Sequence, residues 1–273
     1  MVDIFQTDKR AVFSELEKTL AEKNYAEVPF PVSQQAFVDA AQSFFSFLEL
    51  PQTEKESLHF ILHENDRQGY GYVRRQKGVE DKDNKEFFHY HPVLTEHFKN
   101  LPVLQDPTTV EFFSHAQTIY TACVQATNEI LSAFEVEFPG IRKQLISPDG
   151  AIGMSTIRFL KYEPAGSGNF LAKGHYDRGT MTLALAESAP GLRVGKTAEQ
   201  LALVTHKENT ALFMPALLFS DITDARFTPA WHDVVQTSEN VYRTDAARWA
   251  IVFFADAQHT TTPTLKETHT PKI

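Results

Sequence analysis

The sequence predicts an α+β protein in which helices of the first half buttress a jelly-roll core formed by the second half. Three observations lead to this fold class. Apolar residues recur at helical spacing before residue 150, short β-like runs follow it, and no linker or internal repeat divides the 273 residues. We therefore expect a single domain over residues 1–273, with residues 1–150 mainly helical and residues 151–273 forming the jelly-roll part.

Two stretches of the first half carry the clearest helical signals. Between residues 37 and 48, apolar side chains three and four positions apart form one stripe, and Pro51 predicts the end of that helix. Farther along the chain, Asp106 can cap a helix whose first turn accepts Pro107. We expect this second helix to extend to Phe134 and to be the longest of the chain.

The second half reads as a series of short strands separated by Gly, Pro, Asp and Asn. The predicted strands cover residues 154–162, 180–185, 211–219, 234–237 and 249–255. Several short strands at this spacing are typical of a sandwich or a barrel, and the preceding helices can cover its outer face.

Composition and charge narrow the classes of function. The chain has 26 Lys and Arg against 35 Asp and Glu, a net charge of -9 that repels nucleic-acid phosphates and anionic lipids. No apolar run is long enough to span a membrane, and residues 1–10 lack the apolar core of a secretory signal. The single cysteine, Cys123, excludes an internal disulfide framework. We expect a cytoplasmic protein that binds a small molecule rather than nucleic acid or membrane.

His175 and Asp177 are the first candidates for a metal site. In a strand, side chains two residues apart point to the same side, so this imidazole and carboxylate can converge on one ion. A second pair with this spacing, His206 and Glu208, lies in a polar stretch that we interpret as a solvated turn. His232 follows Asp177 on a distant strand, and two His with one carboxylate form the facial triad that binds Fe(II) with open positions.

Arg248 begins the apolar run of residues 248–254. If this run is a barrel strand, alternation places Arg248, Ala250 and Val252 on one face, and the guanidinium can point into the interior. A buried Arg needs an anion, and a dicarboxylate between Arg248 and the metal would satisfy it, because Arg fits carboxylate in a two-pronged manner.

In these residues the sequence resembles the isopenicillin N synthase-like branch of the Fe(II)- and 2-oxoglutarate-dependent dioxygenases. The family pattern is His-Thr-Asp, a Leu-Thr-Leu-Leu strand, a Gly-Leu-Gln-Val turn, a distal His and a final Arg-Tyr-Ser strand. Similar stretches here are residues 175–185, residues 191–194, His232 and residues 248–254. Residues 44–55, 69–72 and 83–86 are similar, less specifically, to the helix with its Leu-Pro-x-x-x-Lys entry, the Gly-Tyr segment and the Asp-x-Lys-Glu segment of the family.

This resemblance implies a double-stranded β-helix core and an oxidation reaction that depends on Fe(II) and 2-oxoglutarate. It assigns His175, Asp177 and His232 as iron ligands and Arg248 as the residue that holds the far carboxylate of 2-oxoglutarate. In the family, 2-oxoglutarate chelates Fe(II), reaction with O2 releases succinate, and a ferryl intermediate oxidises a small organic molecule, most often by hydroxylation. The protein's part is placement and shielding.

The resemblance also suggests residues for the co-substrate and the substrate. Tyr162 and Thr182 lie in matching segments and are candidates to contact the co-substrate. The family often gathers substrate contacts in the charged and aromatic segment between the helices and the barrel. The candidates in that segment are Tyr70, Arg74, Phe88 and His89.

Two departures from the family pattern leave alternatives open. Ala250 stands where the family has a Ser that shares the carboxylate with Arg, and Glu163 stands where a Tyr contacts the keto acid. A carboxylate facing the pocket at Glu163 would repel 2-oxoglutarate. One alternative is therefore an Fe(II) oxidase on the same scaffold that uses no keto acid. The other is a relative that binds a metal or a small molecule without catalysis.

Overall fold

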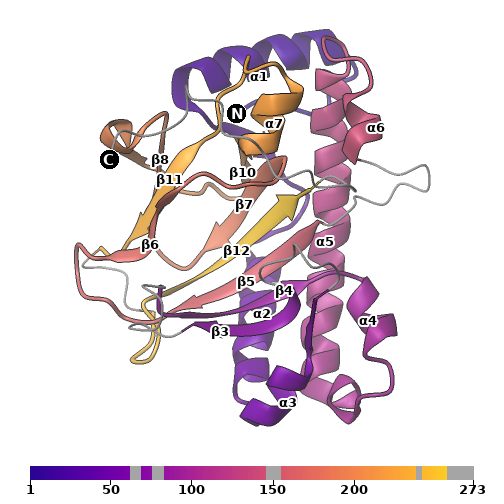
Figure 1. Ribbon diagram of the computed structural model, residues 1–273, viewed down its shortest axis with the longest axis vertical. Coiled ribbons are helices and arrows are strands. Elements are labelled where there is room, and N and C mark those ends of the chain that lie inside the picture. The colour runs from indigo at the N-terminus through magenta and orange to yellow at the C-terminus, as the bar shows by residue number, and fades with distance from the viewer. Residues whose placement is uncertain (62–68, 76–82, 146–154, 238–241, 257–273) are drawn as a thin grey trace.

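The computed structural model describes residues 1–61, 69–75, 83–145, 155–237 and 242–256, and these residues form helices and two antiparallel sheets (Figure 1). The helices are α1 (Lys9–Lys23), α2 (Gln34–Leu48), α3 (Gln52–Ser57), α4 (Val93–His97), α5 (Pro107–Phe134), α6 (Ile141–Leu145) and α7 (Leu217–Ile222). The strands are β1 (Ala26–Pro29), β2 (His59–Phe60), β3 (Tyr70–Arg75), β4 (Lys85–Tyr90), β5 (Thr156–Tyr162), β6 (Phe170–His175), β7 (Met181–Glu187), β8 (Leu192–Gly195), β9 (Ala202–Leu203), β10 (Thr210–Pro215), β11 (Trp231–Val235) and β12 (Arg248–Ala255). Among the described helices, none has the length and apolar character to cross a membrane.

The two sheets draw on different parts of the chain. The larger sheet has the strand order β1-β10-β7-β12-β5-β4-β3-β2, and the smaller has the order β6-β11-β8-β9. Strands β1 to β4 come from the part expected to be mainly helical, yet they supply four of the eight strands of the larger sheet. The two halves of the sequence therefore share one sheet rather than forming separate layers.

Helices α2 and α5 pack against each other and cover one face of the larger sheet (Figure 1). The structure confirms the predicted cap of α5, because the Asp106 side chain accepts a hydrogen bond from the Thr108 backbone N–H at 2.8 Å. Aromatic rings fill the space beneath the helices, and the Phe112 ring lies 5.4 Å from Phe44 and 4.9 Å from Phe159. The main apolar core therefore lies on the helix-covered face of the sheet.

A second, smaller apolar cluster lies between the two sheets. Leu160 and Met214 of the larger sheet share this cluster with Leu192 and Val234 of the smaller sheet. Side chains therefore alternate along the larger sheet between the helix-covered face, which we call the outer face, and the face toward the smaller sheet, which we call the inner face.

The strand predictions are confirmed in outline, with differences at the ends. Met154, the first residue of the first predicted strand, lies outside the described residues. The run 211–219 stops being a strand at Pro215, which has no N–H to continue the ladder, and α7 follows it. Strand β11 starts at Trp231, before the predicted start at residue 234, and so includes His232.

Candidate metal centre and co-substrate pocket

The structure brings His175, Asp177 and His232 together in the cavity between the sheets. Their ligand atoms all lie within 4.8 Å of one another. The two imidazole Nε2 atoms each lie 3.6 Å from a different oxygen of Asp177. His175 is the last residue of β6 and pairs directly with His232 in β11, whereas Asp177 follows just beyond the end of β6. The sheet pairing thus places His232, the predicted third ligand, beside His175.

Backbone carbonyls fix how the two imidazoles point. His175 Nδ1 lies 2.7 Å from the carbonyl oxygen of Lys173, and His232 Nδ1 lies 3.1 Å from that of Ala230. A carbonyl oxygen only accepts, so each Nδ1 carries the proton and donates it. Each Nε2 is then left with a lone pair directed toward Asp177, which is the arrangement in which paired histidines bind a metal.

The electrostatics of this group suit an ionised carboxylate between two imidazoles. Burial alone would raise the pKa of Asp177, but the interactions with the imidazoles of His232 and His175 and the hydrogen bond from Thr182 hold it well below its usual range. Thr182 donates to Asp177 Oδ2 at 2.6 Å. Burial lowers the pKa of His232; for His175 burial acts in the same direction, but the nearby carboxylate of Asp177 outweighs it and raises that pKa.

Arg248 points into the same cavity, as strand alternation predicted. Its side chain is 2% exposed, and Ala250 and Val252 from the same strand also line the cavity. The guanidinium carbon lies 5.7 Å from the ring centre of Tyr162, its partner on β5. Burial lowers the pKa of Arg248 to about 10, so the guanidinium remains charged at neutral pH. Thr182 and Tyr162 both line the cavity, but the Thr182 hydroxyl points toward Asp177.

A residue that sequence reasoning missed contacts Arg248. Arg248 Nη2 donates to Oε2 of Glu187, whose side chain is only 5% exposed. Simple alternation from Ala184 along β7 would turn Glu187 away from the cavity. A register shift in the β7–β12 pairing, a β-bulge, places Ala184 opposite Val252 and Glu187 opposite Ala250, so both line the cavity. No sequence pattern indicates where such a bulge falls.

The interpretation of His206 as a solvated turn residue is wrong. Its side chain is 11% exposed, and Nδ1 lies 3.4 Å from Glu187 Oε1. Nε2 lies 2.9 Å from the backbone carbonyl oxygen of Ala184. The polar segment around His206 is exposed, but the imidazole itself turns back under the sheet and lines the cavity.

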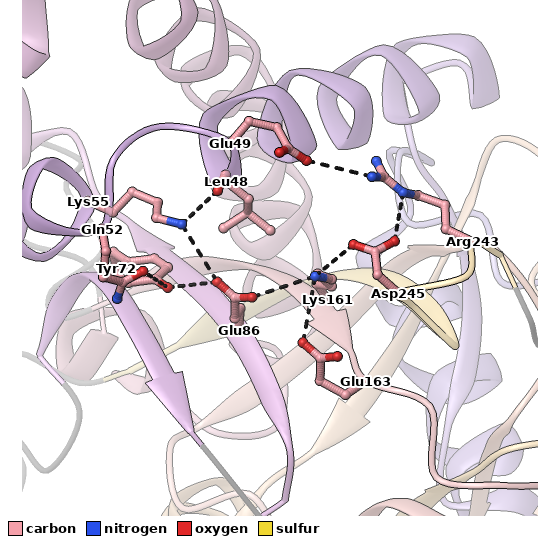
Figure 2. A network of polar contacts seen from close by, with 10 residues as sticks. All are labelled: Leu48, Glu49, Gln52, Lys55, Tyr72, Glu86, Lys161, Glu163, Arg243 and Asp245. Atoms are coloured by element: carbon pink, nitrogen blue, oxygen red, sulfur yellow. Dashed lines mark hydrogen bonds and ion pairs between the residues drawn. The ribbon is translucent and has the colours of Figure 1, made fainter.

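Glu163, in contrast, does not line the cavity. Its Oε1 lies 3.6 Å from Lys161 Nζ, and Lys161 also pairs with Glu86 at 3.6 Å and with Asp245 at 3.0 Å. Figure 2 shows this network, with the carboxylate of Glu163 directed toward Lys161. Lys161 lies on the outer face because it alternates with Tyr162 along β5. The carboxylate that could compete with 2-oxoglutarate is therefore Glu187 and not Glu163.

Among the described residues that line the cavity, none is one of the four substrate candidates. Tyr70 and Phe88 are 2% and 0% exposed and belong to the main core, which speaks against a substrate contact. Arg74 is exposed on β3. His89 is buried and accepts a hydrogen bond from Arg158 Nε at 2.5 Å, and Arg158 itself lines the cavity. His89 therefore contacts a residue that lines the cavity but does not line the cavity itself.

Two cations of the inner face were not among the predicted site residues. Arg158 and Lys85 line the cavity from β5 and β4, and Lys85 Nζ lies 3.0 Å from Asp83 Oδ2. Burial lowers the pKa of Lys85 to about 8. The alternation of residues 85, 87 and 89 on β4 is the signal that could have placed Lys85 inside.

No family model matches the chain, and no curated protein matches it by sequence. Solved structures do resemble it. Full-length T7H of Neurospora crassa, in complex with alpha-KG and 5-formyluracil, has a TM-score of 0.73 at 18% identity over 95% of this chain and 85% of that chain. A 2OG-Fe(II) oxygenase family protein from Caulobacter crescentus has a TM-score of 0.69 at 19% identity over 94% and 86%.

A third similar structure is dioxygenase for auxin oxidation 1 from Arabidopsis thaliana, bound to 2-oxoglutarate. Its TM-score is 0.71 at 13% identity, with 98% of each chain covered. Sequence identities this low establish a shared fold but not a shared activity. The chain therefore has the fold of the 2-oxoglutarate- and Fe(II)-dependent oxygenases.

Proposed function

We propose that this protein is an Fe(II)- and 2-oxoglutarate-dependent oxygenase that oxidises a small organic molecule by hydroxylation. The observation that carries the proposal is the convergence of two imidazole Nε2 atoms on the ionised carboxylate of Asp177. Two His and one carboxylate with open positions suit Fe(II). The two facing antiparallel sheets support a double-stranded β-helix as the core of this enzyme.

The residues that line the cavity have different roles in this proposal. His175, Asp177 and His232 hold Fe(II), which when bound supplies the activation of O2 with electrons from the keto acid. Thr182 orients Asp177 through its hydrogen bond. Arg248 provides the cation for the far carboxylate of 2-oxoglutarate. The apolar walls between the sheets exclude water from the reacting atoms.

The similar structures support the choice of co-substrate. T7H of Neurospora crassa and dioxygenase for auxin oxidation 1 of Arabidopsis thaliana are both complexes with 2-oxoglutarate. Their other ligands do not carry over to this chain, because pocket side chains set the substrate and the fold does not.

Anaerobic titration with Fe(II) tests the metal site. We expect Asp177→Ala to abolish Fe(II) binding and turnover, with the circular dichroism of the folded protein retained. Asp233→Asn is a matched control, because Asp233 follows His232 but pairs with Arg193 Nη2 at 2.6 Å on the other face of the smaller sheet. Equal Fe(II) affinity of Asp177→Ala and wild type would refute the metal site.

A second candidate function is an Fe(II) oxidase that takes all its electrons from the substrate. The contact of Glu187 with Arg248 and the absence of a hydroxyl at Ala250 favour it. Release of succinate and CO2 from 2-oxoglutarate distinguishes the two functions. O2 consumption with substrate and without keto acid would identify the oxidase. Absence of O2 uptake with any substrate would favour the non-catalytic relative.

A further inference from the structure

Three ionisable side chains meet at the end of the cavity that holds Arg248. Arg248 comes from β12, Glu187 from the end of β7, and His206 from the segment between β9 and β10. Their side chains are 2%, 5% and 11% exposed. Glu187 lies between the other two, with Oε2 on the guanidinium and Oε1 toward the imidazole.

Each of the three side chains has a buried polar atom without a hydrogen-bond partner among the described residues. These atoms are Glu187 Oε1, His206 Nδ1 and Arg248 Nε. Buried polar atoms are rarely left in this state unless a ligand, an ion or a proton completes them. The three atoms therefore indicate that the cluster is built for an arrangement other than the ligand-free one.

The hydrogen bond of His206 Nε2 indicates that Nδ1 of the same ring carries no hydrogen when the ring is neutral. Nε2 faces the carbonyl oxygen of Ala184 at 2.9 Å, so in the neutral ring Nε2 carries the hydrogen. Nδ1 then has a lone pair that faces Glu187 Oε1 at 3.4 Å. Two acceptors facing each other repel, whereas a proton on Nδ1 converts the contact into an ion pair.

We propose that Glu187 is a displaceable counter-ion of Arg248, which gives way to the far carboxylate of 2-oxoglutarate and then pairs with protonated His206. This inference rests on the proposed function. In the ligand-free cavity, Arg248 and Glu187 cancel each other's charge. The entering carboxylate adds one negative charge, and a proton taken up from solvent by His206 Nδ1 restores neutrality.

The surroundings of His206 are consistent with this proton uptake. Burial lowers the pKa of His206, which keeps the imidazole neutral before the ligand enters. The charged groups that face it are Glu187 from β7, Arg248 beyond Glu187, and Glu27 from β1, and Glu27 is paired with Lys207 at 2.6 Å. Released from Arg248, Glu187 would present its full charge to Nδ1, and this raises the proton affinity of the ring.

Glu187 therefore sets the affinity for the co-substrate, and direct binding measures it. Calorimetric titration of Mn(II)-loaded protein with 2-oxoglutarate avoids turnover. We expect Glu187→Gln to bind 2-oxoglutarate at least about tenfold more tightly, because no carboxylate then competes for Arg248. Glu163→Gln, the same change at a carboxylate outside the cavity, is the matched control and is expected to leave the affinity unchanged.

Proton uptake gives a second, independent readout. Titrations of wild type near pH 7, where Lys85 already carries its proton, in two buffers of different ionisation enthalpy are expected to report uptake of close to one proton on binding of 2-oxoglutarate. His206→Gln is expected to abolish the uptake and to weaken 2-oxoglutarate about tenfold, with Mn(II) affinity unchanged. This measurement decides the proposal even if Glu187→Gln fails to fold.

The outcomes separate this inference from the proposed function. Failure of wild type to bind Mn(II) or Fe(II) would refute the proposed function. Normal metal binding with 2-oxoglutarate affinity equal or lower in Glu187→Gln, or without proton uptake, would overturn only the role of Glu187. Binding of 2-oxoglutarate by Glu187→Gln and not by wild type would show that the carboxylate of Glu187 is not displaced, and would also overturn the proposal.

Discussion

The larger sheet carries buried charges on both of its faces, and the two faces differ in how completely those charges are paired. On the outer face, Glu86 accepts a hydrogen bond from the Tyr72 hydroxyl at 2.7 Å and pairs with Lys161 at 3.6 Å and with Lys55 at 4.0 Å (Figure 2). Lys55 in turn donates to the backbone carbonyl of Leu48 at 2.6 Å. Every charge in this network has a protein partner.

On the inner face the pairing is incomplete. Glu187 Oε1 and Arg248 Nε have no hydrogen-bond partner among the described residues. The difference teaches that buried charge by itself does not identify a site. Complete pairing indicates a structural network that joins helices to the sheet, whereas incomplete pairing indicates the side that receives a ligand.

The largest effect on the free energy of unfolding is expected from replacing Lys161 in the outer network. Burial lowers the pKa of Lys161, but Asp245, Glu163 and Glu86 outweigh this and raise it above 10.5, so the stabilisation from this charge is present at pH 7 and is lost as the pH rises through the raised pKa. Lys161→Met should lower the free energy of unfolding at pH 7 by about 3 kcal/mol, because buried Glu86 loses a partner. Urea unfolding measures this. Fe(II) affinity should not change, and a loss of Fe(II) binding would contradict the division between the faces.

Replacing Lys85 on the inner face should have the opposite effect on the free energy of unfolding. Its pKa falls from 10.5 to about 8 on folding, so below pH 8 the folded protein bears the full cost of a buried charge. Lys85→Met should therefore raise the free energy of unfolding at pH 7, by up to about 3 kcal/mol. The gain should shrink as the pH rises from 8 to 10.5, where the unfolded chain binds the proton and the folded chain does not. Urea unfolding at two pH values checks this, and a gain independent of pH would contradict it.

The smallest effect concerns Thr182, which donates to Asp177. Thr182→Val keeps the shape of the side chain and removes the donor, so Fe(II) affinity should fall about tenfold. Thr180→Val is the matched control, because the Thr180 hydroxyl is buried and has no hydrogen-bond partner in the described part of the chain. Anaerobic Fe(II) titration of both variants measures the difference, and equal affinities would show that the hydroxyl of Thr182 does not position the ligand.

Much of the site followed from local sequence. The cap at Asp106 with Pro107 predicted α5, and the spacing of His175 and Asp177 with a distant His232 predicted the cluster that the structure brings together. Arg248 was expected inside by alternation, and it lies there. Such features depend on periodicity and capping, which act over a few residues and can be read from the chain itself.

Other assignments depended on which face the helices cover. Tyr70 and Phe88 carry aromatic side chains suited to a substrate pocket, but they lie on the outer face in the core under the helices. Glu163 likewise faces Lys161 rather than the cavity. A strand sequence separates its two faces, but only the packing of other elements determines which one becomes the site.

The sequence by itself indicated His175 with Asp177, an inward-facing Arg248 and the long helix, because two-residue and helical periods fix directions locally, and its resemblance to a family added His232 to the predicted ligands. Only the tertiary structure decided that Glu187 enters the cavity, since a single bulge in the β7–β12 pairing reverses the direction that alternation assigns. It also decided that His206 folds back onto Glu187 from a polar segment. Register shifts and loop paths are set by contacts between residues far apart in the chain, and local pattern does not contain them.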